Sequence, residues 1–164
     1  MSADWTFFVV LLPFLFTAAY TDLKFMLLKN WMNIALFALF LPLGLMVLPV
    51  EDFAYRLCIG LAVFVVLMLL AIFNAFGAGD AKYLAALTPF IAPEDYSAFV
   101  FILCYTNLIA IVLHRIARSV AAIRNLAPDW KSWAARKFPM GYAISGAALF
   151  FFSYRALSGP FALG

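Results

Sequence analysis

The stretch Phe76-Gly77-Ala78-Gly79-Asp80-Ala81-Lys82 decides how this chain can fold, because it sets a carboxylate directly against long apolar runs. A carboxylate near hydrocarbon is unfavourable unless it is paired, hydrated or used in chemistry, so Asp80 is a candidate functional residue. Gly77 and Gly79 lack a Cβ, which lets another backbone approach and permits conformations closed to other residues. Asp22 is the natural second carboxylate of such a site.

The composition is that of a polytopic membrane protein. Of the 164 residues, 68% are hydrophobic and 18% are aromatic, and the mean hydropathy is +1.04, values that do not fit a water-soluble domain. Backbone polar groups inside a bilayer must be paired within the spans, which leaves a helical bundle or a closed barrel. The long apolar runs lack two-residue alternation, which excludes the barrel. The sequence therefore predicts an all-α bundle forming one integral-membrane domain over residues 1–164.

Six segments are expected to cross the membrane, which predicts a bundle of six transmembrane helices. They cover residues 5–20 with an extension toward Asp22, 31–50, 57–76, 81–92, 96–113 and 139–157. The fourth segment is short, about 18 Å long if helical. If it crosses the membrane, it must begin at or before Asp80. That start would place the carboxylate about one turn inside the hydrocarbon, unless the segment is re-entrant.

The basic residues orient these segments. The loops after the first, third and fifth segments hold nine of the eleven Lys and Arg residues, and only Arg56 and Arg155 fall on the other side. By the positive-inside rule, those three loops are cytoplasmic and both termini face outward. Asp22 follows the first segment and Asp80 follows the third. Both carboxylates are therefore expected at the same, cytoplasmic face of the membrane.

Two carboxylates at one face of a bundle can share a proton, because two like charges brought close cannot both be carried easily. The ionised member can take a proton from water while the protonated member polarises a scissile carbonyl, which is aspartic-protease chemistry without metal or cofactor. Such a pair titrates as a unit, so acid and base roles are not assigned separately. The sequence lacks the residues that a histidine-activated nucleophile or a phosphate-binding loop would need. His114 has no suitable Ser or Cys partner, and residues 77–82 lack the spacing of a phosphate-binding loop.

Three stretches resemble the type IV prepilin peptidases, the membrane aspartyl proteases that remove leader peptides from pilin-like precursors. Residues 77–82 match the GxGDxK motif of that family. The stretch from Asp22 is similar to its other aspartate motif, which has a basic residue two positions on and Ile-Pro-Asn ending eight positions on. Here Leu28 and Lys29 stand in the Ile and Pro positions. Residues 139–144 are similar to the PxGxA stretch that opens the last span of the short members.

The resemblance implies an aspartic endopeptidase in which Asp22 and Asp80 are catalytic. It also implies a set of residues that support the motifs or bind substrate: Lys24, Asn30, Gly77, Gly79, Lys82, Pro139 and Gly141. The implied partners are prepilins or pseudopilins with an N-terminal leader, and the bilayer itself. The implied location is the bacterial inner membrane, and neither nucleic acid, cofactor nor metal is expected. The two cysteines form no CxxC pair, so the chain resembles the short, peptidase-only members associated with Flp or Tad pili.

Two other classes of function remain open on the sequence. In a small proton- or cation-coupled transporter, Asp22 and Asp80 would be ion sites at the mouth of a pathway. In a non-catalytic pilus assembly factor, the helices would pack against pilin helices. Transport predicts further polar residues deep in the spans, and the chain has few besides three asparagines, which favours the protease. An aspartate at a helix start can also simply cap it, and Lys82, roughly 200° around a helix from Asp80, is expected to reach the headgroups instead.

Overall fold

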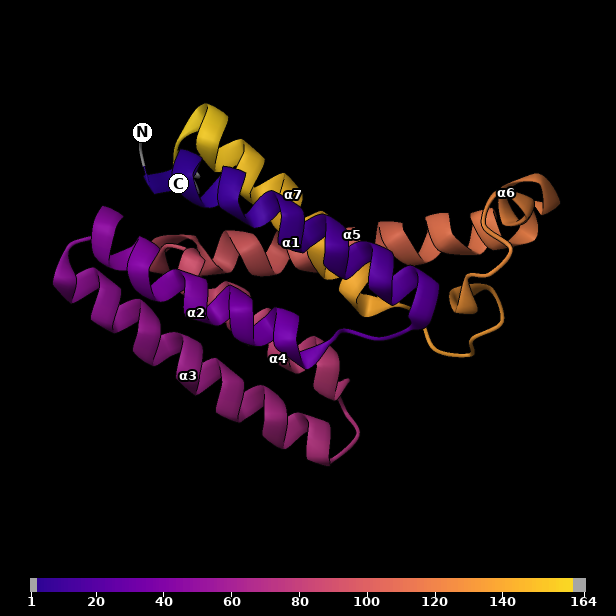
Figure 1. Cartoon of the computed structure of the whole chain (residues 1–164), viewed down its shortest axis with the longest axis horizontal. Coiled ribbons are helices and arrows are strands. Elements are labelled where there is room, and N and C mark those ends of the chain that lie inside the picture. The colour runs from indigo at the N-terminus through magenta and orange to yellow at the C-terminus, as the bar shows by residue number, and fades with distance from the viewer. Residues whose placement is uncertain (1–2, 161–164) are drawn as a thin grey trace.

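The computed structural model describes residues 3–160, and over that range the fold is all-α, as predicted. The described residues form seven helices and three brief 3₁₀ turns, and Figure 1 shows how the helices are arranged. The helices are α1 (Ala3–Phe25), α2 (Asn30–Val47), α3 (Val50–Ile72), α4 (Ala78–Leu87), α5 (Tyr96–Ser119), α6 (Ala121–Leu126) and α7 (Met140–Ser158). The 3₁₀ turns are η1 (Thr88–Phe90), η2 (Pro93–Asp95) and η3 (Lys131–Trp133).

The prediction of six transmembrane helices is supported only in part. Four segments of the described chain are long and apolar enough to cross a membrane: α1, α2, α3 and Pro93–Ser119, which joins η2 to α5. Helix α4 has only 10 residues, which rise about 15 Å against a hydrocarbon thickness of about 30 Å. Helix α7 has 19 residues and is not one of the four.

The third helix begins earlier than predicted, at Val50 instead of residue 57. Pro49 is its N-cap residue, and Glu51 and Asp52 lie in its first turn. Acidic side chains in a first turn are favoured by the helix dipole, so charges that suggest a loop in the sequence are compatible with a helix start. The connection between α2 and α3 is consequently very short.

The helices form two groups that meet along a seam. In one group, α1 and α5 both pack along α7, and in the other α2 and α3 both pack against α4. Contacts of α1 with α2 and of α4 with α7 join the groups. Figure 1 shows α1 and α7 together on one side and α2 and α3 on the other, with α4 and α5 between them. The two aspartate motifs therefore belong to different groups, one on α1 and the other on α4.

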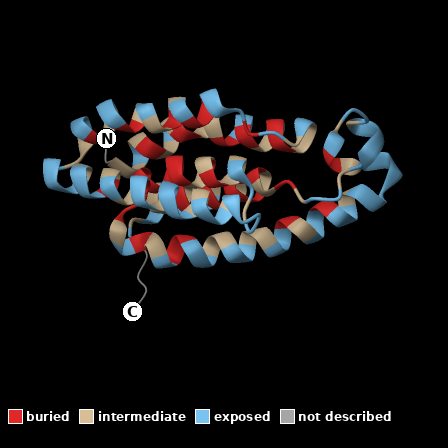
Figure 2. Ribbon diagram, turned by 90° about the horizontal axis from the view of Figure 1, so that it is seen from below, coloured by how far each residue is buried: buried red, intermediate tan, exposed pale blue. Residues whose placement is uncertain are grey.

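Buried side chains line the inner faces of the helices. On α1 they are Phe7, Leu11, Leu15 and Ala18, the spacing of one helix face. The ring of Phe90 meets the rings of Phe7 and Phe40 edge to face, with centroids 5.3 and 5.2 Å apart. Figure 2 shows buried residues on the inward faces, while the outward faces are exposed. Many of these exposed residues are large and apolar, as a surface in contact with lipid requires.

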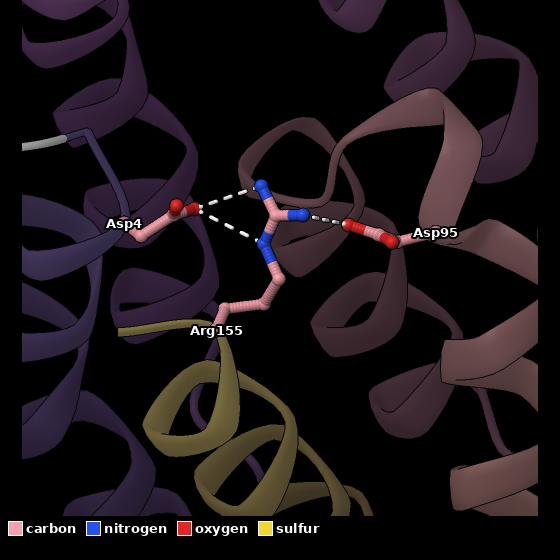
Figure 3. A network of polar contacts seen from close by, with 3 residues as sticks. All are labelled: Asp4, Asp95 and Arg155. Atoms are coloured by element: carbon pink, nitrogen blue, oxygen red, sulfur yellow. Dashed lines mark hydrogen bonds and ion pairs between the residues drawn. The ribbon is translucent and has the colours of Figure 1, made fainter. Parts of the chain in front are cut away.

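An ion-pair cluster marks one end of the bundle (Figure 3). Arg155, in the last turn of α7, donates from Nε and Nη2 to Asp4 Oδ1 at 3.2 and 3.1 Å, and its Nη1 lies 2.8 Å from Asp95 Oδ2. Asp4 is in the first turn of α1, and Asp95 ends η2. Since α1 rises about 27 Å between Asp4 and Asp22, this cluster and Asp22 lie at opposite ends of the bundle.

Candidate active site

Asp22 lies near the carboxyl end of α1 and is only 5% exposed. Its Oδ2 accepts a hydrogen bond from the backbone N–H of Tyr142 at 3.1 Å. Tyr142 is in the first turn of α7, where N–H groups have no partner within the helix and the helix dipole favours a negative charge. Asp22 therefore caps a helix other than its own, and this contact fixes its carboxylate against α7.

Gly141 provides the space that this contact needs. A Cβ at this position would lie 3.0 Å from Asp22 Oδ2 and 2.8 Å from Leu28 Cδ1, both closer than such atoms normally approach. Pro139 is the N-cap residue of α7, where an N–H group would not take part in the helix. The PxGxA stretch thus starts α7 and leaves room beneath it for the carboxylate of Asp22.

Asp80 is in the first turn of α4, and its side chain folds back over Gly77. A Cβ added to Gly77 would collide with Asp80 Oδ2. The backbone of Gly77 has φ −71° and ψ 128°, which any residue can adopt, so the glycine is needed for space and not for an unusual conformation. At Gly79 a Cβ would meet only Leu28 Cβ, at an ordinary 3.6 Å. The two motif glycines are therefore not equivalent.

The structure brings the two aspartates together at the same end of the bundle, from different helix groups. Asp22 Oδ2 lies against the position of Gly141, and Asp80 Oδ2 lies against the position of Gly77. Leu28, in the loop between α1 and α2, is 6% exposed and lies against the positions of both Gly79 and Gly141. It therefore separates α4 from α7 beside the carboxylates. The sequence shows Leu28 only as a departure from the family motif and gives no sign of this role.

A buried pair of hydroxyls also crosses the seam. The Tyr83 hydroxyl on α4 lies 3.0 Å from Ser145 Oγ on α7, and Ser145 Oγ donates to the carbonyl of Gly141 at 2.8 Å. Tyr83 follows Asp80 by one turn, and Gly141 adjoins the N–H that binds Asp22. Sequence analysis missed both hydroxyls. The available signal was a polar group on each of two faces that are otherwise apolar.

The remaining predicted site residues fall into two places. Lys82 Nζ donates to Asn30 Oδ1 at 3.0 Å, so Lys82 joins α4 to the start of α2. That it also reaches the headgroups stays a prediction. Lys24 Nζ donates to the Tyr20 hydroxyl at 2.9 Å and lies over the rings of Tyr20 and Phe25. These contacts are all within α1, and none of them brings Lys24 to either aspartate.

A helical membrane bundle that gathers two buried or half-buried carboxylates at one end has the parts of a membrane aspartyl protease. Residues 9–113 match the type IV leader peptidase family, a match that covers well over half of the 164 residues, and the chain belongs to that family. It is accordingly a prepilin peptidase, an aspartic endopeptidase. The matched range contains both aspartates and ends within α5. Searches of curated proteins and of solved structures found no match.

Proposed function

We propose that Asp22 and Asp80 form the catalytic dyad, and that the protein removes the leader of Flp- or Tad-type prepilins at the cytoplasmic face of the bacterial inner membrane. The observation that carries this proposal is the convergence of the two carboxylates at one end of the bundle, from helices α1 and α4. The short peptidase-only character rests on the resemblance of the motifs.

The reaction needs one proton shared between the two carboxyl groups. The ionised carboxylate accepts a proton from water as the water oxygen attacks the carbonyl carbon of the scissile peptide, and the protonated carboxyl donates to the carbonyl oxygen. The tetrahedral intermediate then collapses and the C–N bond breaks. The leaving amine takes the proton that the first carboxylate received from water, and a hydroxyl of the intermediate returns a proton to the other carboxylate. Microscopic acid and base roles belong to the pair as a unit. Gly77 and Gly141 support this chemistry because each leaves the space that one carboxylate occupies.

In this proposal, six segments form the membrane domain. Helix α4 with η1, and helix α7, complete the bundle beside the four long apolar segments. Ala81, Tyr83, Ala85 and Leu87 of α4 are buried among α2, α3 and α7, so a segment too short to cross lipid alone is shielded by protein. Both termini lie outside, and the loops that carry nine of the eleven basic residues lie in the cytoplasm.

The test is a cleavage assay of Asp22→Asn and Asp80→Asn at matched membrane abundance. Each substitution should lower cleavage by roughly a hundredfold or more, because each removes a group that transfers a proton. The control is Asp52→Asn, which changes an exposed carboxylate in the first turn of α3 and should leave cleavage unchanged. Normal cleavage by either dyad variant would falsify the proposal. Loss of a proton or cation flux with cleavage intact would instead support the transporter.

A further inference from the structure

A cavity of about 510 Å³ lies among α2, α3 and α4, and neither Asp22 nor Asp80 lines it. Most of its lining is apolar, with Ile34 and Leu41 from α2 and Leu61 and Phe64 from α3. These four side chains are between 39% and 68% exposed. The cavity therefore opens on the outer surface of the bundle, which faces the bilayer.

The cavity runs from the end of the bundle that holds the aspartates toward the middle of the membrane. Its lining begins at Asn30 and Lys82, and Lys82 follows Asp80 by two residues. On α2 the lining continues to Leu41, a rise of about 16 Å. That length is about half of a hydrocarbon core roughly 30 Å thick. A peptide helix that enters the membrane at the site would meet this cavity over its first turns.

Asn33 distinguishes a peptide from a lipid as the occupant. It lines the cavity and is 5% exposed, and neither its amide nitrogen nor its amide oxygen has a hydrogen-bond partner in the described part of the chain. A buried amide without partners is unfavourable, so the cavity suits an occupant that supplies polar groups. A lipid acyl chain has none. The first turn of a helix has four N–H groups without a partner.

We infer that this cavity seats the first turns of the substrate's apolar helix, with the Asn33 carbonyl accepting an N–H group from its first turn. The inference rests on the proposed function. Asp80 lies roughly 200° around α4 from Lys82, so the substrate must pass over the amino end of α4, at Gly77 to Gly79, to reach the dyad. A helix is about 10 Å across and an extended residue spans about 3.3 Å. About three extended residues should therefore separate the scissile bond from the seated helix.

Cross-linking in membranes tests the position of the helix. The enzyme carries Asp80→Asn to retain substrate, Cys58→Ser and Cys104→Ser to remove two exposed thiols, and Ala38→Cys in the cavity lining. The probe is a Flp-type prepilin with single cysteines placed along its apolar helix. Cross-links should appear at positions on one face of that helix. The control, Val66→Cys, is exposed on α3 outside the cavity and should give none. Equal cross-linking at both positions, or none at Ala38→Cys, would overturn the inference.

Kinetics in an otherwise native enzyme give the second arm. Ala38→Trp fills the cavity and should raise KM for the intact prepilin roughly tenfold, the equivalent of one lost apolar side-chain contact. It should not affect cleavage of a soluble peptide that ends before the apolar helix. Asn33→Leu should lower kcat/KM for the intact prepilin on the order of fivefold. The matched control is Asn107→Leu, because the Asn107 amide is already bonded to Leu103 O of its own helix.

The two arms separate failure of the cavity from failure of the proposed function. Suppose that the native enzyme cleaves prepilin, that Ala38→Trp leaves KM unchanged and that Ala38→Cys gives no cross-link. These results would show that the substrate does not occupy the cavity, while the proposed peptidase activity would stand. A cross-link confined to Ala38→Cys without any cleavage by the native enzyme would overturn the proposed reaction. It would still support the cavity as a binding site for the apolar helix.

Discussion

The hydroxyl of Tyr83 lies 3.0 Å from Ser145 Oγ, and this contact joins the helix that carries Asp80 to the helix that Asp22 caps. Ser145 Oγ donates its own hydrogen to the Gly141 carbonyl at 2.8 Å, so the Tyr83 hydroxyl is the donor to Ser145. Both residues are buried. The two halves of the site are thus held together by a polar contact inside an apolar interface, where it is not weakened by water.

Tyr83→Phe should lower kcat for prepilin cleavage several-fold with little change in KM, because α4 loses a contact that sets the position of Asp80 relative to Asp22. The loss of stability should be about 1 kcal/mol. Thr88→Val is the matched control, since it removes a buried hydroxyl bonded only to Leu84 O within the same segment. If both variants lose similar stability and both keep full kcat, the Tyr83 contact serves stability alone.

Gly77→Ala and Gly79→Ala should behave differently. The first substitution places a Cβ against the carboxylate of Asp80, so the side chain must move, and cleavage should fall by at least about tenfold. The second adds an ordinary contact with Leu28 and should leave most activity, with a gain in helix stability of roughly 0.5–1 kcal/mol. Cleavage rates at matched membrane abundance, with thermal unfolding in detergent, measure both. Equal losses of cleavage would contradict this difference.

Gly141→Ala should lower both stability and cleavage, because its Cβ would press on Asp22 and Leu28. Leu28→Val removes the two Cδ atoms that a Cβ at 141 would meet at 2.8 and 2.9 Å. The double variant should therefore lose less than the sum of the two single losses, by about 1 kcal/mol in the free energy of unfolding. A double-mutant cycle on unfolding and cleavage measures this coupling. Strict additivity would mean that the two side chains do not compete for space.

Arg155→Met should destabilise the bundle by roughly 3 kcal/mol, since it leaves the carboxylate of Asp95, which is 1% exposed, without its ion pair. Adding Asp95→Asn should restore part of the loss by removing the buried charge that has lost its ion pair to Arg155. Both variants should retain kcat in their folded fraction, because this cluster lies at the opposite end of α1 from Asp22. Thermal unfolding and active-fraction kinetics test these expectations. A fall in kcat of the folded enzyme would contradict this prediction, because it would mean that the Arg155 cluster affects the aspartates at the other end of the bundle.

The sequence predicts the features that depend on local pattern and on motif. Apolar runs predict the all-α class, and the quoted stretches around Asp22 and Asp80 predict the peptidase family. It does not predict contacts between distant helices. Neither the loop residue Leu28 nor the hydroxyl of Tyr83 shows its partner in the sequence, because both roles depend on the approach of α7. Nor does local pattern show how α4 is placed, because this helix of 10 residues packs against α2, α3 and α7.

The glycine motif illustrates the same limit. Sequence reasoning gives a glycine two possible uses, an unusual backbone conformation or a close approach. Gly77 has an ordinary backbone conformation and a neighbouring carboxylate in the space of its missing Cβ. Only the position of the Asp80 side chain distinguishes the two uses. That position depends on how α4 packs, which no local pattern records.

The capping of α7 by Asp22 affects how variants of this residue are to be interpreted. Asp22 holds the first turn of a helix that begins 118 positions later in the sequence than itself, at Met140. An alanine at position 22 removes the proposed reacting group and a structural anchor together, so loss of activity would mix two causes. Asparagine keeps a side-chain oxygen that can accept the Tyr142 N–H and removes the ionisable carboxyl group. An alanine scan would therefore overstate the share of Asp22 in the chemistry, while the asparagine variant isolates it.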